Sequence, residues 1–349
     1  MNIAVLLPSL KDSSPIQVAK DIVEKLIIEG CRVEVFYLKD IVELSFDCPI
    51  NKISLFEKFD FENYDIIHSH MIRPNFYIWY YKKNIKNLCV STLHNEIDKV
   101  LKDHYGILIS KIFTPLWVIF LKAQDQVICL SKVAKKQLEK KYNITKSTYI
   151  YNGRTVSDGY ISSDDIDILE LKKDKYVILG IIANISKIKG IDQIINSLDK
   201  LDDFCLVIIG DGPDLERLKN LVRGKGLDER CVFFGYKKNA YLFLEYIDIY
   251  MMTSYSEGFP LVMIEAAQYK KPIVCSNLPI FNEFFNENQV SFFELDNKHS
   301  LINAVKIAVN KKNILSKNIY DVYLEKYTKN IMGFNYYTEF KNLSKRKEN

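Results

Sequence analysis

Two glutamates, Glu257 and Glu265, stand in the stretch 254–266, where carboxylates could serve a sugar-binding chemistry. The apolar run 247–252 before it is typical of a buried strand, and the breaker-free run from Pro260 onward is typical of a helix. Free N–H groups at a helix start suit a phosphate, and carboxylates accept hydrogen bonds from adjacent sugar hydroxyls. The stretch therefore suits a nucleotide diphosphate sugar, although the helix dipole alone also favours acidic residues near a helix start.

The residues around these glutamates form a recognisable pattern. They read Glu257-Gly258-Phe259-Pro260-Leu261, then Glu265-Ala266, then Lys271-Pro272-Ile273-Val274. This pattern resembles the Glu-x7-Glu signature of retaining glycosyltransferases of family four. The resemblance implies that Glu257 acts on the transferred sugar and that Glu265 holds the donor ribose. It also implies donor contacts from Gly258, Phe259, Pro260 and Leu261.

Three further places in the second half of the chain match motifs of that family. Lys189-Gly190 matches its Lys-Gly, whose lysine binds the donor diphosphate, and a lysine at a helix start is otherwise unfavourable. Gly235-Tyr236 stands where the family's base pocket begins. The tripeptide 210–212 resembles the family's glycine turn, although a simple strand-to-helix turn explains it equally well.

Two positions depart from the family pattern. The arginine that the family usually carries five residues before its lysine is Asn184 here, and Lys187 could supply charge without an arginine's bidentate geometry. The glycine pair of the family's first loop is absent, and Ser13 and Ser14 stand there with N–H groups that could face a phosphate. We therefore assign Lys189 the largest share of diphosphate neutralisation.

Two histidines follow apolar strands in the first half of the chain. His70 ends a segment that resembles the family's His-x-His, and His94 ends one that resembles its Thr-x-His. In the family the second of these histidines faces the acceptor and the reacting sugar. Ligands of an open α/β sheet lie beyond the carboxyl ends of its strands, although a lone histidine there is often structural. We expect His94 to be catalytic and His70 to be on the acceptor side.

Composition limits the class of protein. With 349 residues, 48% hydrophobic and 26% charged, the chain is expected to form two globular domains. Seven scattered cysteines without a Cys-x-x-Cys indicate buried thiols in a reducing compartment. The N-terminus predicts a first strand, not a signal peptide, and no apolar run reaches the roughly 18 residues of a membrane span.

Strands that alternate with helices predict two parallel, doubly wound α/β sheets. With the motifs, this order resembles the GT-B fold, in which two Rossmann-like domains face a central cleft. Ser14 and Pro15 predict the N-cap and first residue of a helix that ends at Glu29. The expected parts are an N-terminal Rossmann-like acceptor domain, a polar linker, a C-terminal Rossmann-like nucleotide-sugar domain, and a helical segment that packs back toward the first domain, at 1–155, 156–173, 174–325 and 326–349.

The net charge of +4 lies wholly in residues 1–153, which hold 21 lysines and arginines against 17 aspartates and glutamates. Aromatic, apolar and basic residues mix in 76–83 and 107–121, and lysines crowd one predicted helix at positions 132, 135, 136, 140 and 141. Each segment alone is consistent with a solvated lysine face or an ordinary core helix. Together they indicate a surface that contacts anionic lipid.

These observations predict a cytoplasmic, peripherally membrane-associated retaining glycosyltransferase of the hexosyl or N-acetylhexosaminyl type. It would move a sugar from a nucleotide sugar to a glycan or polyprenyl-linked acceptor in cell-surface polysaccharide synthesis. No cofactor, metal site or nucleic-acid partner is expected. A catalytically weak sugar-nucleotide-binding subunit is the alternative, whereas an oxidoreductase lacks support because Gly-x-Gly-x-x-Gly is absent from both domain starts.

Overall fold

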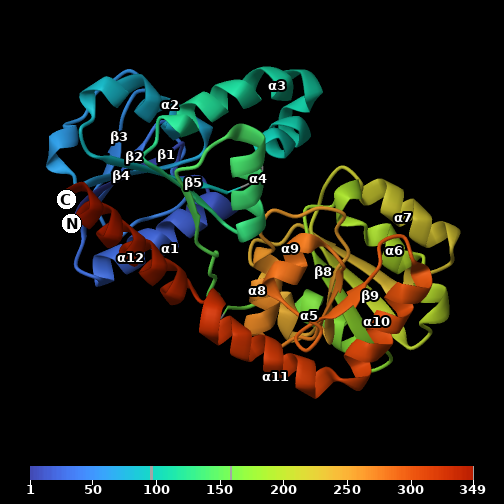
Figure 1. Cartoon of the computed structure of the whole chain (residues 1–349). Helices are drawn as coiled ribbons and strands as arrows, with labels where there is room; N and C mark the ends of the chain where they lie inside the picture. Colours follow the sequence, from blue (N-terminus) through green and yellow to red (C-terminus); the bar gives the residue numbers. More distant parts are fainter. Residues whose placement is uncertain (95–96, 158, 349) are drawn as a thin grey trace. The chain divides into compact units, whose positions relative to one another are not determined.

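A computed structural model describes residues 1–94, 97–157 and 159–348 of the protein. The chain forms two compact units, and each is described by itself. Unit 1 consists of residues 1–153 and 326–349, and unit 2 consists of residues 154–325. Each unit is built on one parallel β-sheet that its helices cover (Figure 1).

The sheet of unit 1 has the strand order β3-β2-β1-β4-β5-β6-β7. Its strands are β1 Asn2–Leu7, β2 Arg32–Tyr37, β3 Ile50–Lys52, β4 Ile66–His70, β5 Leu88–Leu93, β6 Gln126–Cys129 and β7 Ser147–Tyr149. Its helices are α1 Ser14–Ile28, α2 Ile72–Tyr81, α3 Ile97–Lys122, α4 Lys132–Tyr142 and α12 Lys329–Glu348. The central strands β1 and β4 are almost wholly buried, because helices cover both faces of a parallel sheet.

The sheet of unit 2 has the strand order β10-β9-β8-β11-β12-β13. Its strands are β8 Val177–Ile182, β9 Phe204–Ile209, β10 Cys231–Gly235, β11 Ile249–Met252, β12 Ile273–Ser276 and β13 Ser291–Phe293. Its helices are α5 Ser163–Lys173, α6 Ile191–Ile195, α7 Leu215–Gly224, α8 Leu261–Gln268, α9 Pro279–Phe284, α10 Lys298–Asn310 and α11 Lys312–Val322. The predicted pair of parallel α/β sheets is thus confirmed.

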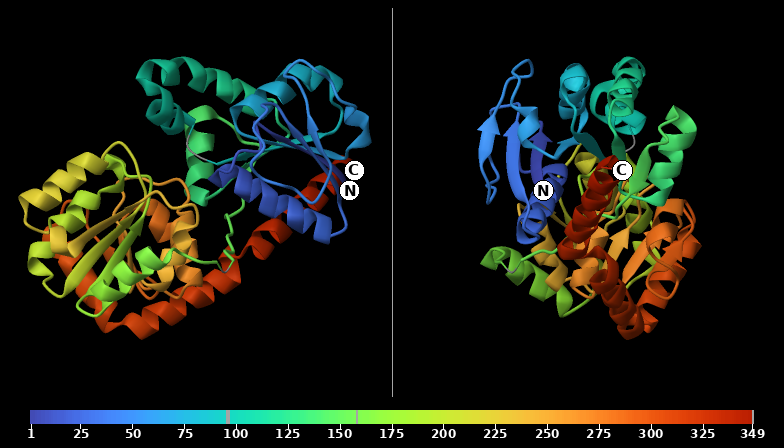
Figure 2. Two further views of the ribbon diagram at one scale, coloured as in Figure 1. Left: turned by 180° about the vertical axis from the view of Figure 1, so that it is seen from behind. Right: turned by 60° about the vertical axis from the view of Figure 1, so that its left-hand side comes forward.

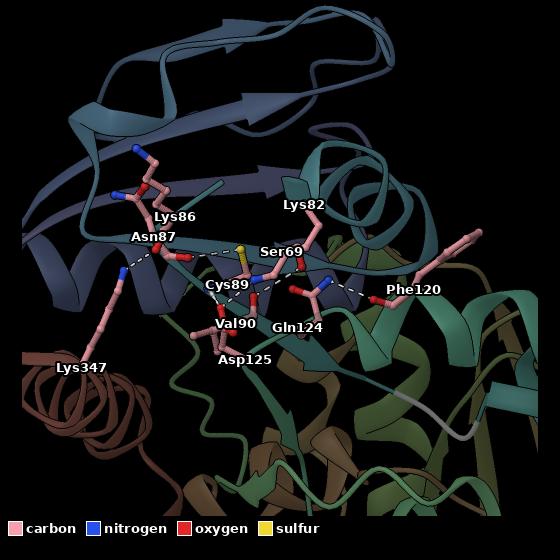
Figure 3. A network of polar contacts seen from close by, with 10 residues as sticks. All are labelled: Ser69, Lys82, Lys86, Asn87, Cys89, Val90, Phe120, Gln124, Asp125 and Lys347. Atoms are coloured by element: carbon pink, nitrogen blue, oxygen red, sulfur yellow. Dashed lines mark hydrogen bonds and ion pairs between the residues drawn. The ribbon is translucent and has the colours of Figure 1, made fainter. Parts of the chain in front are cut away.

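Helix α12 lies along α1 in both views of unit 1 (Figures 1 and 2). Gly333 permits this close approach, because a Cβ at that position would lie 2.3 Å from the Cβ of Lys25. Further along α12, Tyr336 and Phe340 are fully buried and their rings contact His68 of β4. Near the end of α12, Lys347 donates a hydrogen bond to the backbone carbonyl of Lys86 (Figure 3). The segment after unit 2 therefore completes the core of unit 1.

Two sequence expectations differ from the structure. The stretch 156–173 was expected to be a polar linker, yet it contains helix α5, which Ser162 caps by accepting a hydrogen bond from the N–H of Asp165. Leu169 of this helix is fully buried, and this burial stabilises a helix whose acidic composition resembles an exposed connection. The N-cap of α1 is Ser13, not Ser14, and the helix ends at Ile28.

The seven cysteines all lie within the described residues and carry free thiols. Six are buried and Cys48 is partly exposed. Burial raises the pKa of the Cys129 thiol to about 12, so this thiol stays protonated and unreactive at neutral pH.

Candidate functional site

In unit 2 the first candidate carboxylate, Glu257, lies on the turn between β11 and α8. Its Oε1 atom accepts hydrogen bonds from Lys189 Nζ and from Ser254 Oγ, both at 2.6 Å. The side chains of Lys189 and Glu257 are 24% and 12% exposed. A pair this close and this sheltered is stronger than a surface ion pair. The structure therefore joins the residue expected for the sugar to the residue expected for the diphosphate.

The local backbone explains how Lys189 reaches that position. Gly190 has a left-handed φ of 58°, and a Cβ there would lie 2.4 Å from the carbonyl oxygen of Thr253. Thr253 in turn donates a hydrogen bond from its hydroxyl to the carbonyl of Lys189. Only glycine tolerates this left-handed turn against the end of β11. The Lys-Gly pair therefore brings a lysine next to the turn that carries Glu257.

The second candidate carboxylate, Glu265, lies in the second turn of α8. Its Oε1 atom accepts a hydrogen bond from Nε of Arg154 at 3.1 Å. Burial raises the pKa of the Glu265 carboxyl, and the guanidinium of Arg154 opposes this rise. Sequence reasoning missed Arg154, because it stands 111 positions before its partner and follows no motif that marks it.

Tyr250 of β11 connects the two carboxylates electrostatically. Burial raises the pKa of this phenol well above its usual value, and the nearby charges of Glu257 and Glu265 raise it further. Its hydroxyl donates a hydrogen bond to the carbonyl of Ile182. Tyr250 therefore stays neutral, and the charges of both carboxylates act on it.

The remaining donor-side predictions fall at the carboxyl ends of the strands of unit 2. Phe259 contacts the ring of Phe284 with centroids 4.8 Å apart. Tyr236 is 76% exposed directly after Gly235, which has a φ of 69°. The other predicted residues lie on the turn into α8, at its first residue or on the loop after β8, and these are Gly258, Pro260, Leu261, Asn184 and Lys187.

The loop after β9 packs against the loop after β8. A Cβ on Gly210 would lie 1.8 Å from the carbonyl oxygen of Ala183, and a Cβ on Gly212 would lie 2.6 Å from Oδ1 of Asn184. The carbonyl of Asp211 also accepts a hydrogen bond from the N–H of Ile185. The glycines at 210 and 212 thus allow two backbones to meet beside the exposed amide of Asn184.

In unit 1 the predicted histidines contact each other. His70 ends β4, His94 follows β5, and His70 Nδ1 lies 2.8 Å from His94 Nε2. Burial lowers the pKa of His94 to about 4 and the pKa of His70 well below its usual value. Both imidazoles are therefore neutral at pH 7, so one ring donates the shared hydrogen and the other accepts it.

A second buried pair lies behind these histidines. His68 Nε2 lies 2.8 Å from Oγ1 of Thr92, and the Thr92 hydroxyl lies 3.1 Å from the hydroxyl of Tyr336 on α12. The ring of His68 also contacts the ring of His70, with centroids 4.2 Å apart. The sequence motif indicated His70 and His94, and the segment 326–349 was expected to pack back toward the first domain, but no motif marked the contact of Tyr336 with Thr92.

The first loop of unit 1 carries Ser13 and Ser14 at the start of α1. The side chain of Ser13 does not cap the helix, although its carbonyl accepts hydrogen bonds from the N–H groups of Ile16 and Gln17. Ser14 is exposed. Across the described part of the chain, no cluster of three histidines, cysteines or carboxylates is arranged to hold a metal ion.

Comparison with known proteins assigns both halves of the chain. Residues 163–324 match the family described as "Glycosyl transferases group 1", and residues 17–157 match "Glycosyltransferase Family 4". This chain belongs to the GT-B glycosyltransferases of the family-four type. The predicted family and fold class are thereby confirmed.

Relatives and solved structures agree with this assignment. The O-antigen biosynthesis glycosyltransferase WclY of Escherichia coli is 29% identical, over 98% of this chain and 99% of its own. The UDP-Gal:alpha-D-GlcNAc-diphosphoundecaprenol alpha-1,3-galactosyltransferase of Escherichia coli is 26% identical, over 76% of this chain and 72% of its own. HepE of Anabaena in complex with UDP shares the fold, with a TM-score of 0.79 at 16% identity, covering 98% of this chain and all of its own.

Proposed function

We propose that this glycosyltransferase moves a sugar, with retention of configuration, from a nucleotide diphosphate sugar to a lipid-linked glycan in cell-surface polysaccharide synthesis. The ion pair between Glu257 and Lys189 carries the proposal. It places a carboxylate for sugar hydroxyls and a cation for phosphates in one contact at the start of α8. The WclY relative, by its name an O-antigen enzyme, supports the surface-polysaccharide role.

Each predicted donor residue has a proposed role in unit 2. Glu265 accepts hydrogen bonds from the ribose, and Glu257 accepts them from the transferred hexose or N-acetylhexosamine. Lys189, aided by the exposed Lys187, stabilises the charge that develops on the leaving diphosphate without a metal ion. On binding, the donor phosphates compete with Glu257 for the lysine, and the freed carboxylate turns to the sugar. Attack from the face of the leaving phosphate, or through a carboxylate nucleophile, would retain configuration.

The acceptor side is proposed for unit 1. The neutral His94 lies at the carboxyl end of β5, and His70 holds one of its ring nitrogens. A relative named for a diphosphoundecaprenol substrate supports a polyprenyl-linked acceptor. Unit 1 holds 27 lysines and arginines against 19 aspartates and glutamates, a net charge of +8 that favours contact with an anionic membrane. Within the described residues, no helix is long and apolar enough to cross a membrane.

The test is a transfer assay on purified protein with a panel of UDP-sugars and a short polyprenyl diphosphate-linked sugar. Thermal stabilisation by one donor would identify the nucleotide sugar, because a ligand that binds only the folded state raises the unfolding temperature. Product formation with the donor's own anomeric configuration, read by proton NMR, supports the proposal. Donor binding without either transfer or donor hydrolysis would instead support the alternative of a catalytically weak binding subunit.

A further inference from the structure

Helices α2 and α3 of unit 1 enclose an apolar groove of about 570 Å³ that the proposed donor site does not use. This volume lies within the roughly 300–1,000 Å³ of typical small-molecule sites. The groove is lined from α2 by Ile72, Arg73 and Phe76 and from α3 by Ile109, Phe113 and Phe120. The rings of Phe76 and Phe120 meet edge to face across it, with centroids 5.3 Å apart. The groove therefore has an aromatic floor and a single charged lining residue.

That charged residue, Arg73, is exposed in the first turn of α2. Within the described residues no carboxylate lies within ion-pair distance of its guanidinium. A guanidinium presents parallel N–H donors that match a phosphate, and its charge calls for an anionic partner. An apolar groove with an unpaired arginine is complementary to an amphiphile that has a hydrocarbon chain and a phosphate head.

The surface of α3 around the groove is also apolar. Leu108 and Ile112 are 75% and 63% exposed. The stretch 106–122 contains two lysines, Lys111 and Lys122, and no carboxylate. Exposed apolar patches of this kind mark contacts with lipid or with a partner. The groove is thus the sheltered part of a larger apolar surface, and this surface has no carboxylate in 106–122 to repel an anion.

The arginine end of the groove is adjacent to the acceptor side. Arg73 follows His70 by three residues, and Met71 between them adopts a positive φ of 71°. Such a backbone is unfavourable for methionine and turns the chain sharply from β4 into α2. The head of an amphiphile bound at Arg73 would therefore lie at the same sheet edge as His70 and His94.

We propose that this groove binds the first isoprene units of the polyprenyl diphosphate-linked acceptor, with Arg73 holding its diphosphate. The inference rests on the proposed function and extends it by assigning the lipid part of the acceptor to named residues. The diphosphate at Arg73 would position the sugar that it carries near His94. The chain beyond the first units would leave the groove along the exposed side of α3.

The test uses farnesyl diphosphate, at concentrations where it forms no micelles, and the protein's own tryptophans. The chain has two, Trp79 on α2 and Trp117 on α3, and the Trp79 ring lies 5.2 Å from that of Phe120 in the groove. Farnesyl diphosphate should change their fluorescence saturably. Arg73→Gln should weaken this binding about tenfold or more, as expected for a lost charge-assisted hydrogen bond.

Matched variants separate the groove from the surface. Phe113 lines the groove and Ile119 does not, yet their side chains on α3 are 44% and 46% exposed. Phe113→Gln should weaken binding severalfold, whereas Ile119→Gln should bind like the parent. Lys111→Gln removes an exposed charge from the same helix outside the groove and should also bind like the parent. Equal losses in Phe113→Gln and Ile119→Gln, or an unaffected Arg73→Gln, would overturn the proposal.

Two further outcomes discriminate the ligand and the function. If dihexanoyl phosphatidic acid competes as well as farnesyl diphosphate, the groove is a phospholipid site and the polyprenyl assignment fails. The binding measurement needs no donor and no turnover. If the variants bind farnesyl diphosphate as predicted but the protein transfers sugar to no acceptor, the proposed function is refuted and the assignment of the groove stands. If Arg73→Gln transfers sugar with an unchanged KM for the polyprenyl-linked acceptor, the assignment of the groove alone is refuted.

Discussion

We assign Glu265 one role in the protein without donor and another in the protein with donor bound. Its carboxyl is buried in the second turn of α8 and has Arg154 as its guanidinium partner. In the absence of donor the arginine stabilises the charged carboxylate, and a bound ribose would supply further hydrogen bonds. Burying a charge is costly unless it is paired, so the carboxylate needs Arg154 when no donor is bound. A bound ribose would need hydrogen bonds to the same carboxylate oxygen atoms.

Glu265→Gln should weaken UDP binding about ten- to hundredfold, because it replaces a charged acceptor of ribose hydrogen bonds with a neutral one. Glu257→Gln should lower the turnover number while UDP binds as before, because we assign Glu257 to the transferred sugar. Isothermal titration with UDP and initial rates with the cognate nucleotide sugar measure the two effects. Equal losses of UDP affinity in both variants would contradict this division of roles.

Lys189→Ala should be more damaging to donor binding than Lys187→Ala. Lys189 is held 2.6 Å from Glu257, whereas Lys187 is an exposed lysine two residues away and serves as the matched control. Loss of Lys189 would remove the proposed phosphate ligand and would take the cation away from a sheltered carboxylate. Donor affinity is measured for both variants by thermal shift. If Lys189→Ala binds donor as well as the parent, groups other than Lys189 bind the diphosphate.

Arg154→Met should destabilise the protein more at about pH 7.5 than at about pH 5. The pKa of Glu265 is raised in the folded state, so over that window the folded state binds more protons than the unfolded one, and the free energy of unfolding falls as pH rises. Removing Arg154 raises this pKa further, so the free energy of unfolding falls more steeply as pH rises. The variant should therefore be less stable than the parent by about 3 kcal/mol near pH 7.

Urea unfolding at both pH values measures the effect of Arg154→Met. Arg32→Met is the control, because the Arg32 side chain is 77% exposed and lies at the long ion-pair distance of 3.8 Å from Glu34. Its cost should be small and the same at both pH values. A pH-independent loss in Arg154→Met would show that the arginine acts by packing and not through the charge of Glu265.

At the scale of elements, the contact between α1 and α12 depends on a missing side chain. Gly333→Ala should destabilise unit 1 by about 1–3 kcal/mol, because the new methyl group would overlap Lys25. Alanine is otherwise the better helix former by about 1 kcal/mol, so without the overlap the substitution should stabilise the protein. Gly224→Ala at the end of α7 meets no atom within 4 Å and is the control. A stabilised Gly333→Ala in thermal unfolding would contradict the close packing.

Much of the fold at this scale could be predicted from local patterns. Buried strands such as β1 and β11 are short apolar runs, and their alternation with helices implies a parallel sheet. Helix α5 was missed because burial of Leu169, which no local pattern reveals, stabilises an acidic segment. For the candidate residues, glycine and charge motifs marked both glutamates and Lys189. No motif marked Arg154 beside Glu265 in unit 2 or Tyr336 beside Thr92 in unit 1, because only tertiary packing brings these partners together.

At the scale of the whole molecule, the charge is more uneven than the first 153 residues indicate. The segment 326–349 adds six basic residues and two acidic ones to unit 1, so unit 1 carries +8 and unit 2 carries −4. On α4, Lys136 and Lys140 are exposed, whereas Lys135 is 3.3 Å from Glu139. A strongly basic unit is attracted to anionic surfaces over about one Debye length.

Binding to anionic vesicles should therefore be measurable at low salt and should fall steeply as salt is added, since each lysine near the surface contributes roughly 1 kcal/mol. Changing Lys135, Lys136, Lys140 and Lys141 to glutamate should reduce it further, while activity on a short acceptor without lipid persists. Vesicle cosedimentation measures this, with neutral vesicles as the control. A quadruple variant that binds like the parent would show that these lysines are only a solvated face.

The position of α12 in the sequence has a consequence for how the chain is made on the ribosome. Unit 2 is continuous in sequence, whereas unit 1 waits for a helix that is translated after all of unit 2. At about 5–20 residues per second, the 154–325 segment occupies the ribosome for roughly ten seconds or more. During that time Lys25 has no Gly333 beside it and His68 has no Tyr336 over its ring. The first unit to begin synthesis is thus the last to close, and the ring of His68 is covered by Tyr336 and Phe340 only once α12 has been translated.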